Sequence, residues 1–284
     1  MTTHVDPQRQ PLPCEGGDHL TLFRWALPPT QPSRGVVLLV HGLGEHAGRY
    51  QAVAQRLLAW GFEVRAYDQY GHGLSSGPRG VLPTSERLLE DLGRVIAHTR
   101  TQMHAAQPLV LLGHSMGGCV SARYVSLQPE AVQALVLSSP ALDIGLSSAQ
   151  RGLLKFLLRW APELTIGNGL KVRKISHDQA VVEAYKNDPL VHGRVCARLV
   201  QFMAQAGPAV LDTARTWRVP TLLLFAQDDA LVRPQGSRDF AQAAPQGVVQ
   251  AHEFAALYHE IFNELKPQAV FTALQDWLTQ RFAL

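Results

Sequence analysis

The feature that most constrains this fold is a regular alternation of short apolar runs with longer amphipathic stretches. Six runs are predicted to be strands: Val36–Val40, Phe62–Tyr67, Leu109–Leu112, Leu135–Leu137, Leu222–Phe225 and, more weakly, Val248–Phe254. Five stretches are predicted to be helices: Tyr50–Trp60, Ser85–His104, Met116–Leu127, Gln235–Ala243 and Pro267–Phe282. Apolar runs bounded by Gly or Pro are typical of strands buried on both faces. The alternation therefore predicts an α/β fold in which helices cover both faces of a mostly parallel sheet.

Two segments depart from this alternation. His19–Ala26 is predicted to be an antiparallel strand at the edge of the sheet. Between Asp143 and about Gln205 no strand-like run is visible, and helical segments with loops predict an α-helical insertion between two strands. The predicted organisation is a core in two parts, residues 1–142 and 206–284, with a helical cap over residues 143–205.

Composition excludes several classes of protein. Of the 284 residues, 46% are hydrophobic and 17% are charged, which is a globular balance and not that of a disordered chain. The net charge of +3 is too small to indicate a nucleic-acid partner. Three widely spaced cysteines, Cys14, Cys119 and Cys196, form neither a disulfide framework nor a zinc motif. With no apolar leader and no apolar run of ~18 residues, the sequence favours a soluble protein of the cytoplasm.

The most informative motif is Gly113-His114-Ser115-Met116-Gly117, which lies between a predicted strand and a predicted helix. G-x-S-x-G in this context is typical of a nucleophile elbow, a sharp turn that lifts the serine hydroxyl above the sheet. The backbone of such a turn is strained, and side chains at Gly113 or Gly117 would collide with neighbouring backbone. The motif therefore predicts that Ser115 is a catalytic nucleophile.

A serine nucleophile needs a base and an acid behind that base, and both follow in the expected order. Asp228 and Asp229 lie at the end of the strand predicted at 222–225, and His259 lies in a short loop after the last strand. The remaining histidines lie near the N-terminus, in loops, on predicted helices, in the insertion or inside the last strand, so His259 is the predicted base. The residues alone leave the acid open between Asp229 and its neighbour, with Asp143 as a third candidate.

An oxyanion hole needs two backbone N–H groups aimed at the reacting oxygen. The residue after the nucleophile, Met116, is expected to supply one of them. The loop after the strand at 36–40 is expected to supply the other from Leu43, with Gly42 letting the backbone approach the substrate. His41 is expected to hold this loop in place.

The same loop supports a rival interpretation. Residues 42–47 match the G-x-G-x-x-A pattern of dinucleotide-binding loops, and Asp68 follows at the end of the next predicted strand. That pattern does not account for the serine elbow or for an acid and a histidine at later strand ends, so the hydrolase interpretation is favoured. A metal site at His41, His46 and His72 is disfavoured because these loops carry no matching carboxylate or thiolate spacing.

The sequence resembles the monoacylglycerol lipase and lysophospholipase group of the α/β-hydrolases. The matching stretches are HGLGEHAGRY (41–50), YDQYGHGLSSGPRG (67–80), LLGHSMGG (111–118), LVLSSPAL (135–142), NDPLVHG (187–193), LLLFAQDDALV (222–232) and LYHEIFNE (257–264). The resemblance implies an Asp-x-x-(Leu/Val) turn for the acid, which selects Asp229, and oxyanion donors at Leu43 and Met116. One departure is Ala226, which stands where several relatives have glycine.

The activity implied by the resemblance is hydrolysis of carboxylic esters, with monoacylglycerols or lysophospholipids as the expected substrates and no cofactor or metal. A carboxylesterase of small esters, or a carbon–carbon hydrolase, would use the same three residues and remains an alternative. A non-catalytic receptor is a further alternative, although such relatives usually lack a member of the triad and none is missing here.

The predicted cap contains one strongly amphipathic segment, Arg151–Trp160. At about 100° per residue, Arg151, Lys155 and Arg159 share one narrow arc and the apolar residues share the opposite, broader one. Between residues 151 and 174 there are six basic residues and one acid. One interpretation is a cap helix packed on the core with its basic stripe solvated; the alternative is that this region contacts lipid surfaces transiently. Four apolar residues are candidates to line an acyl tunnel above the nucleophile: Leu153, Phe156, Leu157 and Trp160.

Overall fold

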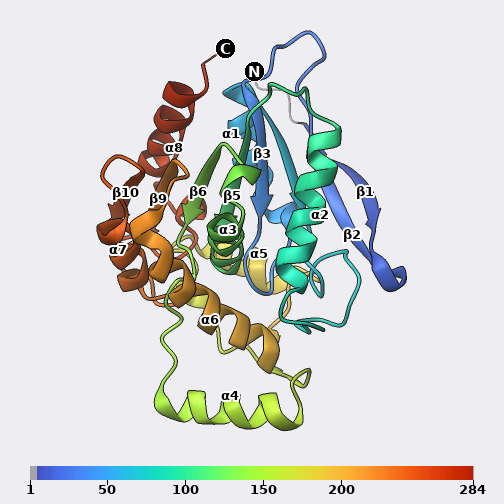
Figure 1. Cartoon of the computed structure of the whole chain (residues 1–284), viewed down its shortest axis with the longest axis vertical. Coiled ribbons are helices and arrows are strands. Elements are labelled where there is room, and N and C mark those ends of the chain that lie inside the picture. Colours follow the sequence, from blue (N-terminus) through green and yellow to red (C-terminus); the bar gives the residue numbers. More distant parts are fainter. Residues whose placement is uncertain (1–4, 284) are drawn as a thin grey trace.

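Eight strands form the main sheet in a computed structural model that describes residues 5–283. They are β1 (Gln8–Pro13), β2 (His19–Trp25), β3 (Gly35–Val40), β4 (Phe62–Tyr67), β5 (Leu109–His114), β6 (Ala134–Ser138), β9 (Thr221–Ala226) and β10 (Val249–Phe254). Their spatial order is β1-β2-β4-β3-β5-β6-β9-β10, and every pair from β4 to β10 is parallel (Figure 1). The six predicted strands and the mostly parallel sheet are confirmed.

The predicted edge strand is antiparallel but does not lie at the edge. His19–Trp25 pairs with β4 on one side and with β1 on the other, so β1 is the outermost strand. The sequence of β1, QRQPLP, is polar and mostly exposed and contains two prolines. Strands of this kind are confined to sheet edges, and they carry no hydrophobic alternation by which a sequence could reveal them.

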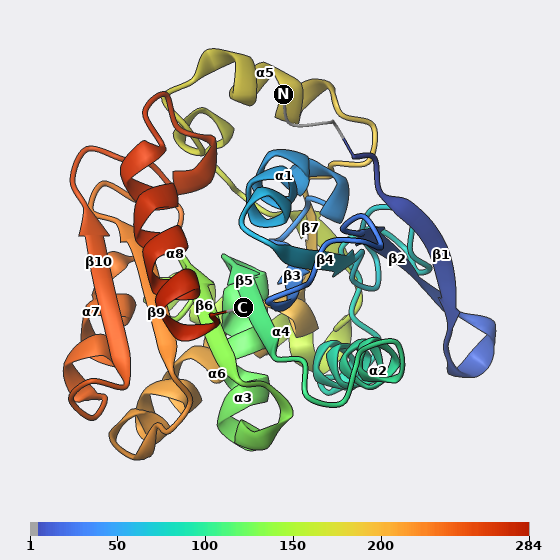
Figure 2. The same cartoon turned by 90° about the horizontal axis from the view of Figure 1, so that it is seen from above.

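Two helical layers cover the sheet. The helices are α1 (Gln51–Ala59), α2 (Arg87–Thr101), α3 (Met116–Leu127), α4 (Ser148–Trp160), α5 (Gln179–Asn187), α6 (Ala197–Thr213), α7 (Pro234–Ala243) and α8 (Gln268–Arg281). Buried side chains of α2, α3, α6 and α7 pack on one face, and those of α1 and α8 pack on the other. Figure 2 shows the two layers from above. The α/β fold predicted from the alternation, with helices on both faces of a mostly parallel sheet, is therefore confirmed.

The strand register brings four loops together at one edge of the sheet. Val40 at the end of β3 is paired with Gly113, so the loop that begins at His41 lies beside the turn that follows β5. Ala226 at the end of β9 is paired with Phe254 at the end of β10. Because parallel strands place their carboxyl ends at the same edge, the loops after these strands can share one site.

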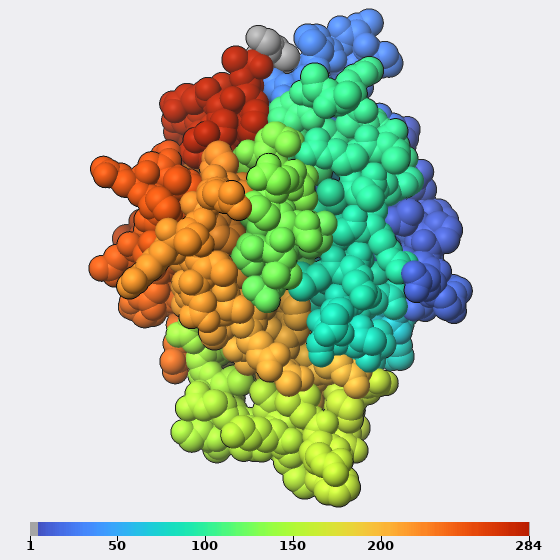
Figure 3. Space-filling view, viewed as in Figure 1, coloured from blue at the N-terminus to red at the C-terminus, as the bar shows by residue number. Residues whose placement is uncertain are grey.

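The inserted region is not entirely helical. Between α4 and α6 it contains a short antiparallel pair, β7 (Thr165–Gly167) with β8 (Arg194–Cys196), in addition to α5. Strands of three residues are too short to produce a periodic pattern. The boundary expected at residue 205 falls within α6, whose buried side chains belong to the core below the insertion. Figures 1 and 3 show α4 standing at the end of the molecule, beyond α6.

Within the part of the chain that the structure describes, no helix combines the length and the hydropathy needed to span a bilayer.

Candidate active site

Ser115 lies at a strained turn between β5 and α3. Its backbone has φ 54° and ψ −121°, a left-handed conformation that is rare for a residue with a side chain. Its backbone N–H donates to the Ser138 carbonyl at 3.0 Å, and its carbonyl accepts from the N–H groups of Cys119 and Ala141. The surrounding backbone therefore holds the turn in the conformation that the motif predicts.

The two glycines of the motif are required sterically. A Cβ atom on Gly117 would lie 2.1 Å from the carbonyl oxygen of Val40, and one on Gly113 would lie 2.5 Å from the carbonyl oxygen of Gly117. Neither approach is possible for a larger residue without moving the backbone. The close contact with Val40 also fixes the elbow against the loop that follows β3.

His259 and Asp229 form a buried pair at the ends of β10 and β9. His259 Nδ1 lies 2.6 Å from Asp229 Oδ2, and both side chains are about 5% exposed or less. The other carboxylate oxygen of Asp229, Oδ1, accepts the N–H groups of Leu231 and Val232. The geometry thus selects Asp229 over Asp228, which is exposed.

The third candidate acid lies in a different environment. Asp143 Oδ1 accepts the backbone N–H of Gly145 at 2.8 Å, and Oδ2 lies 3.8 Å from Arg233 Nη1. Asp143 thus stabilises the loop that leads into the insertion and does not contact His259.

The pair shifts both pKa values in the directions that a catalytic dyad needs. Burial disfavours the cationic form of His259, but the Asp229 carboxylate and the hydrogen bond to it outweigh burial and raise the pKa of His259. Burial also disfavours ionised Asp229, but the imidazole and the two backbone N–H donors outweigh it and lower the pKa of Asp229. The Asp229 carboxylate therefore favours its charged form and lies where it can stabilise a positive charge on His259.

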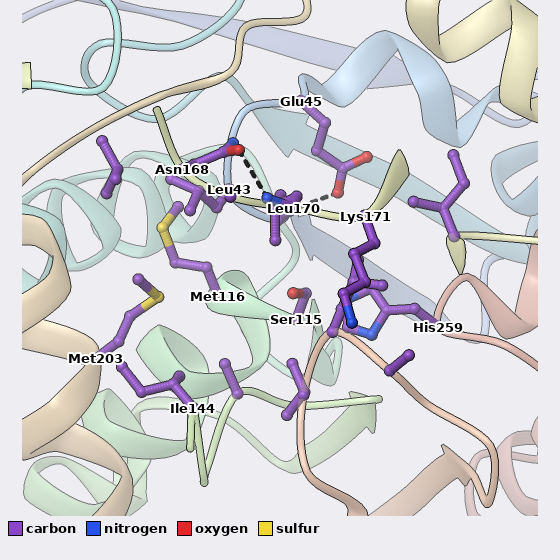
Figure 4. Close-up of a pocket in the computed structure, with 18 of the residues that line it drawn as sticks. Leu43, Glu45, Ser115, Met116, Ile144, Asn168, Leu170, Lys171, Met203 and His259 are labelled. Carbon is purple, nitrogen blue, oxygen red and sulfur yellow. Dashed lines mark hydrogen bonds between the residues drawn. The ribbon is translucent and has the colours of Figure 1, made fainter. Parts of the chain in front are cut away.

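Ser115 and His259 line the same cavity together with the two expected oxyanion donors, Leu43 and Met116. Figure 4 shows Ser115 between the His259 ring on one side and Leu43 and Met116 on the other. Gly42 approaches the nucleophile closely, since a Cβ on Gly42 would lie 3.1 Å from the Ser115 Cβ. The structure thus brings together the five residues for which the sequence predicts chemical roles.

His41 is buried beneath this loop. Its Nε2 accepts the backbone N–H of Gln69 at 2.9 Å, and its Nδ1 lies 2.8 Å from the Gly42 carbonyl oxygen. Both ring nitrogens of His41 therefore contact backbone groups, and neither points to a reacting atom.

His114 packs directly against the predicted base. Its ring centroid lies 4.8 Å from that of His259, and its Nδ1 lies 3.1 Å from Ser138 Oγ. Burial, together with the nearby His259, lowers the pKa of His114 to about 4. His114 is therefore neutral near pH 7 and adds no charge beside His259.

A buried ionic network that the sequence analysis missed joins the oxyanion loop to the His259 loop. Glu45 Oε1 accepts the Gly42 N–H at 2.6 Å and the Tyr50 hydroxyl at 2.7 Å. Glu45 Oε2 lies 2.5 Å from Arg49 Nη1, and Arg49 forms two 2.8 Å hydrogen bonds with Glu260. Glu260 directly follows His259, so one guanidinium connects the two loops.

Electrostatic interactions favour the charged forms of Glu45 and Arg49 in this network. Burial disfavours the Glu45 carboxylate, but Arg49 and other neighbours outweigh burial and lower the pKa of Glu45. The available sequence signal was the i,i+4 spacing of Glu45 and Arg49, which is common on solvated helices and does not by itself indicate a buried pair.

The four cap residues predicted to contact the substrate do not line the cavity at Ser115. Leu153, Phe156 and Trp160 are 51%, 61% and 69% exposed, and Leu157 is half-buried. The apolar walls come instead from the two ends and the middle of the insertion and from the loop after β9: Ile144, Leu146, Ile175, Val195, Met203 and Leu231. Helix α4 exposes three of the six apolar side chains of its arc to solvent, which its amphipathic pattern alone could not reveal.

Asp68, the acidic residue of the rival dinucleotide-binding pattern, already accepts hydrogen bonds from within the protein. Asp68 is fully buried, and its carboxylate oxygens accept the N–H groups of Ala47 and Leu74 at 2.8 and 2.7 Å. A ribose hydroxyl would need that same carboxylate. Among the described residues no group of three or more His, Cys, Asp or Glu side chains is arranged to hold a metal ion. His46 instead contacts Asp188 at 2.8 Å.

Comparisons with known proteins agree with this geometry. The model of the family described as "Serine aminopeptidase, S33" matches residues 31–266. A monoacylglycerol lipase of Mycolicibacterium smegmatis is 36% identical over 93% of this chain and 94% of its own length. An uncharacterized abhydrolase domain-containing protein of Dictyostelium discoideum is 33% identical over 92% of this chain, which spans 28% of that protein. The crystal structure of Paleococcus ferrophilus monoacylglycerol lipase superposes with a TM-score of 0.82 at 33% identity, covering 91% of this chain and 98% of that one.

A parallel sheet with a serine elbow after one strand, and a histidine–aspartate pair after the last two, defines an α/β-hydrolase. Within that superfamily the chain belongs to the serine aminopeptidase S33 family, in the group of the monoacylglycerol lipases. It is a carboxylic ester hydrolase that acts on a small lipid or ester.

Proposed function

We propose that this protein hydrolyses monoacylglycerols through an acyl-enzyme formed on Ser115. His259 removes the hydroxyl proton as Ser115 attacks the ester carbonyl, and it then gives that proton to the departing glycerol oxygen. Water, deprotonated by the same imidazole, releases the fatty acid and regenerates the serine. Asp229 holds the tautomer of His259 that has a free Nε2 and stabilises the imidazolium.

The oxyanion of each tetrahedral intermediate would be bound by the N–H groups of Leu43 and Met116. The Glu45–Arg49–Glu260 network supports this assignment because Glu45 fixes Gly42, which directly precedes Leu43. A donor held in advance stabilises developing charge without reorganising during the reaction.

The observation that carries the proposal is an apolar space leading away from Ser115. The cavity at the nucleophile has a volume of ≈290 Å³. A second cavity of ≈410 Å³ lies between α4 and α6 and shares Ile144, Leu146 and Met203 with the first. Because the two cavities share these walls, we propose that a long acyl chain bound at Ser115 extends from the first cavity into the second, toward Leu154 and Leu158 of α4. The lining of the second cavity also includes Asp143, Arg151 and Lys155.

Activity on a series of monoacylglycerols is expected to rise with acyl length. Burying each methylene gains about 0.8 kcal/mol, so kcat/KM should increase by up to about fourfold per carbon until the path is full. Met203→Trp, which narrows the junction of the two cavities, should shift the optimum to shorter chains. Leu127→Trp, at an exposed position on α3, is the matched control. A flat profile, with short nitrophenyl esters as the best substrates, would instead support a small-ester carboxylesterase.

Hydrolysis of lysophospholipids is a second candidate because a cation lies at the cavity. Lys171 lines the pocket, and Figure 4 shows its side chain extending beside His259. A phosphate on the leaving glycerol could pair with this ammonium group. The relative activity on lysophospholipids and monoacylglycerols, measured in the same series, distinguishes the two substrates.

We further propose that α4 and the segment after it rest on a lipid surface. Five exposed apolar side chains lie close together in sequence there: Leu153, Phe156, Trp160, Leu164 and Ile166. Arg151, Lys155 and Arg159 share the same helix, and the Arg159 guanidinium lies 4.9 Å from the Trp160 ring centroid. Apolar residues flanked by basic ones are typical of helices that lie at the interface of anionic membranes.

Reversing all three α4 charges to Glu is expected to weaken binding to anionic vesicles by roughly 10²-fold, since each cation contributes about 1 kcal/mol near such a surface. Turnover of micellar esters should fall with binding, while turnover of soluble nitrophenyl esters should not change. Arg215→Glu, an exposed arginine on the core, is the control. Equal losses on micellar and soluble substrates would contradict the docking proposal.

A further inference from the structure

A row of basic and amide side chains crosses the edge of the sheet that lies away from Ser115. Arg24 in β2 is the register partner of Arg65 in β4, and Gln8 in β1 is the partner of Arg24. Register partners stand on the same face of a sheet, so the two arginine side chains leave it side by side. Like charges placed directly opposite each other are destabilising unless something neutralises them.

Arg65 lacks the acceptors that a buried guanidinium needs. The residue is only 5% exposed, and its Nη1 donates to the Gln102 side chain just beyond the end of α2. Its Nε and Nη2 atoms have no hydrogen-bond acceptor within residues 5–283. The carboxylate whose charge acts on Arg65 is that of Glu63, which contacts Arg24. Burial, and then the charge of Arg24, lower the pKa of Arg65. Burying a cation without a partner lowers the stability of the folded state. An anion bound beside Arg65 would offset this loss.

The charge of Arg24 is only partly neutralised by its neighbours. Its side chain is 42% exposed, and Nη2 contacts Glu63 at 3.4 Å, which is long for an ion pair. Its Nε atom also lacks an acceptor within the described residues. Together the two arginines present three N–H-bearing atoms that no described group satisfies.

A cavity of ≈270 Å³ is lined by the side chains of Arg24 and Arg65 and by residues of β1, β2, β4 and the end of α2. Figure 2 shows where these strands and α2 lie relative to one another. Besides Arg24 and Arg65 its walls include the amides of Gln8, Gln10 and Gln102. Arg9 also lines it, although the Arg9 guanidinium stacks over the Phe23 ring, 5.4 Å from the centroid. No acidic residue belongs to the described lining, so its formal charge is positive.

We propose that this cavity is a binding site for a small oxyanion of the phosphate class, separate from the ester-hydrolysing site. Guanidinium groups bind phosphate through paired N–H···O contacts, and two of them on adjacent strands can engage different oxygens of one tetrahedral ion. The amide side chains supply further donors. The volume leaves room for the first atoms of an organic group, so the free ion and a phosphate monoester would share this chemistry.

The test is a titration of thermal stability with inorganic phosphate and, in a parallel arm, with glycerol phosphate. Chloride keeps the ionic strength constant in both arms. The wild-type chain should show a saturable rise in Tm, because a ligand that binds only the folded state stabilises it. Arg65→Met and Arg24→Gln should require at least about tenfold more phosphate for the same rise, since each removes a charge-assisted contact. Arg215→Gln, an exposed arginine elsewhere, should respond as the wild type does. A stronger response to glycerol phosphate than to phosphate would assign the site to a monoester.

Two outcomes would overturn the proposal. One is a phosphate effect that does not saturate and is equal in all four proteins, because that is a general salt effect. The other is an unresponsive wild type whose Tm rises when Arg65 becomes Met, because Arg65 would then be an unfavourable buried cation with no ligand. If Arg65→Met does not fold, the half-exposed Arg24→Gln variant decides between these outcomes. Ester turnover provides a check that each variant has the native structure.

Discussion

Replacing Ser115 by alanine is expected to reduce kcat for ester hydrolysis by at least about 10⁴-fold while leaving the folded structure intact. The hydroxyl is the atom that forms the acyl-enzyme, and no neighbouring group can substitute for it. Alanine tolerates the same backbone angles about as well as serine does, and the elbow is held by backbone contacts with Ser138, Cys119 and Ala141. The Tm should therefore remain close to that of the wild type.

Two measurements check this expectation. A fluorophosphonate probe should label the wild-type chain at residue 115 and should not label the alanine variant. Ser126→Ala, which removes a hydroxyl from α3, 11 positions beyond Ser115, should retain full activity and labelling. If Ser115→Ala kept measurable turnover near the wild-type rate, the nucleophile would have to lie elsewhere.

The sheet was predictable because its inner strands are buried on both faces. Runs such as VVLLV at 36–40 have no polar position, and only a strand between two helical layers requires that. The elbow was predictable for a related reason, since the steric demands at Gly113 and Gly117 leave little choice of residue. The fold and the nucleophile can therefore be predicted from short stretches of the sequence.

Other parts depend on long-range contacts that no local pattern records. Strand β1 exists because β2 offers it a free edge, although its own sequence is polar. The Arg49 guanidinium bridges Glu45 and Glu260, which are more than 200 positions apart, and nothing near either residue indicates the other. Helix α4 was predicted to be amphipathic, but periodicity does not say whether protein, lipid or solvent meets its apolar arc.

The identity of the catalytic acid could be predicted only in part from the local sequence. Sequence order places an acid after β9 but does not distinguish Asp228 from Asp229, and only resemblance to the family favoured the latter. The physical distinction is made by the turn itself. The N–H groups of Leu231 and Val232 hold one oxygen of Asp229, and this orients the other oxygen toward His259.

That orientation makes Asp229→Asn a sharp test of the mechanism, with Asp228→Asn as its matched control. In the variant the backbone N–H groups of Leu231 and Val232 still require an oxygen, so the amide NH₂ must take the position now held by Oδ2. It would donate to His259 Nδ1 and place the ring proton on Nε2, where it cannot accept the serine proton. We expect kcat to fall by about 10⁴-fold, as removal of such an acid does elsewhere.

The pH dependence gives this substitution a second readout. His259 must be neutral to act as a base, so wild-type activity is lost as pH falls through its raised pKa. Because Asp229 raises that pKa and burial lowers it, Asp229→Asn should move the acid limb of residual activity to lower pH. Asp228→Asn changes an exposed side chain and should alter neither kcat nor the profile. If Asp228→Asn were instead the inactive variant, the buried pair would not be the catalytic one, and the assignment of the acid would be wrong.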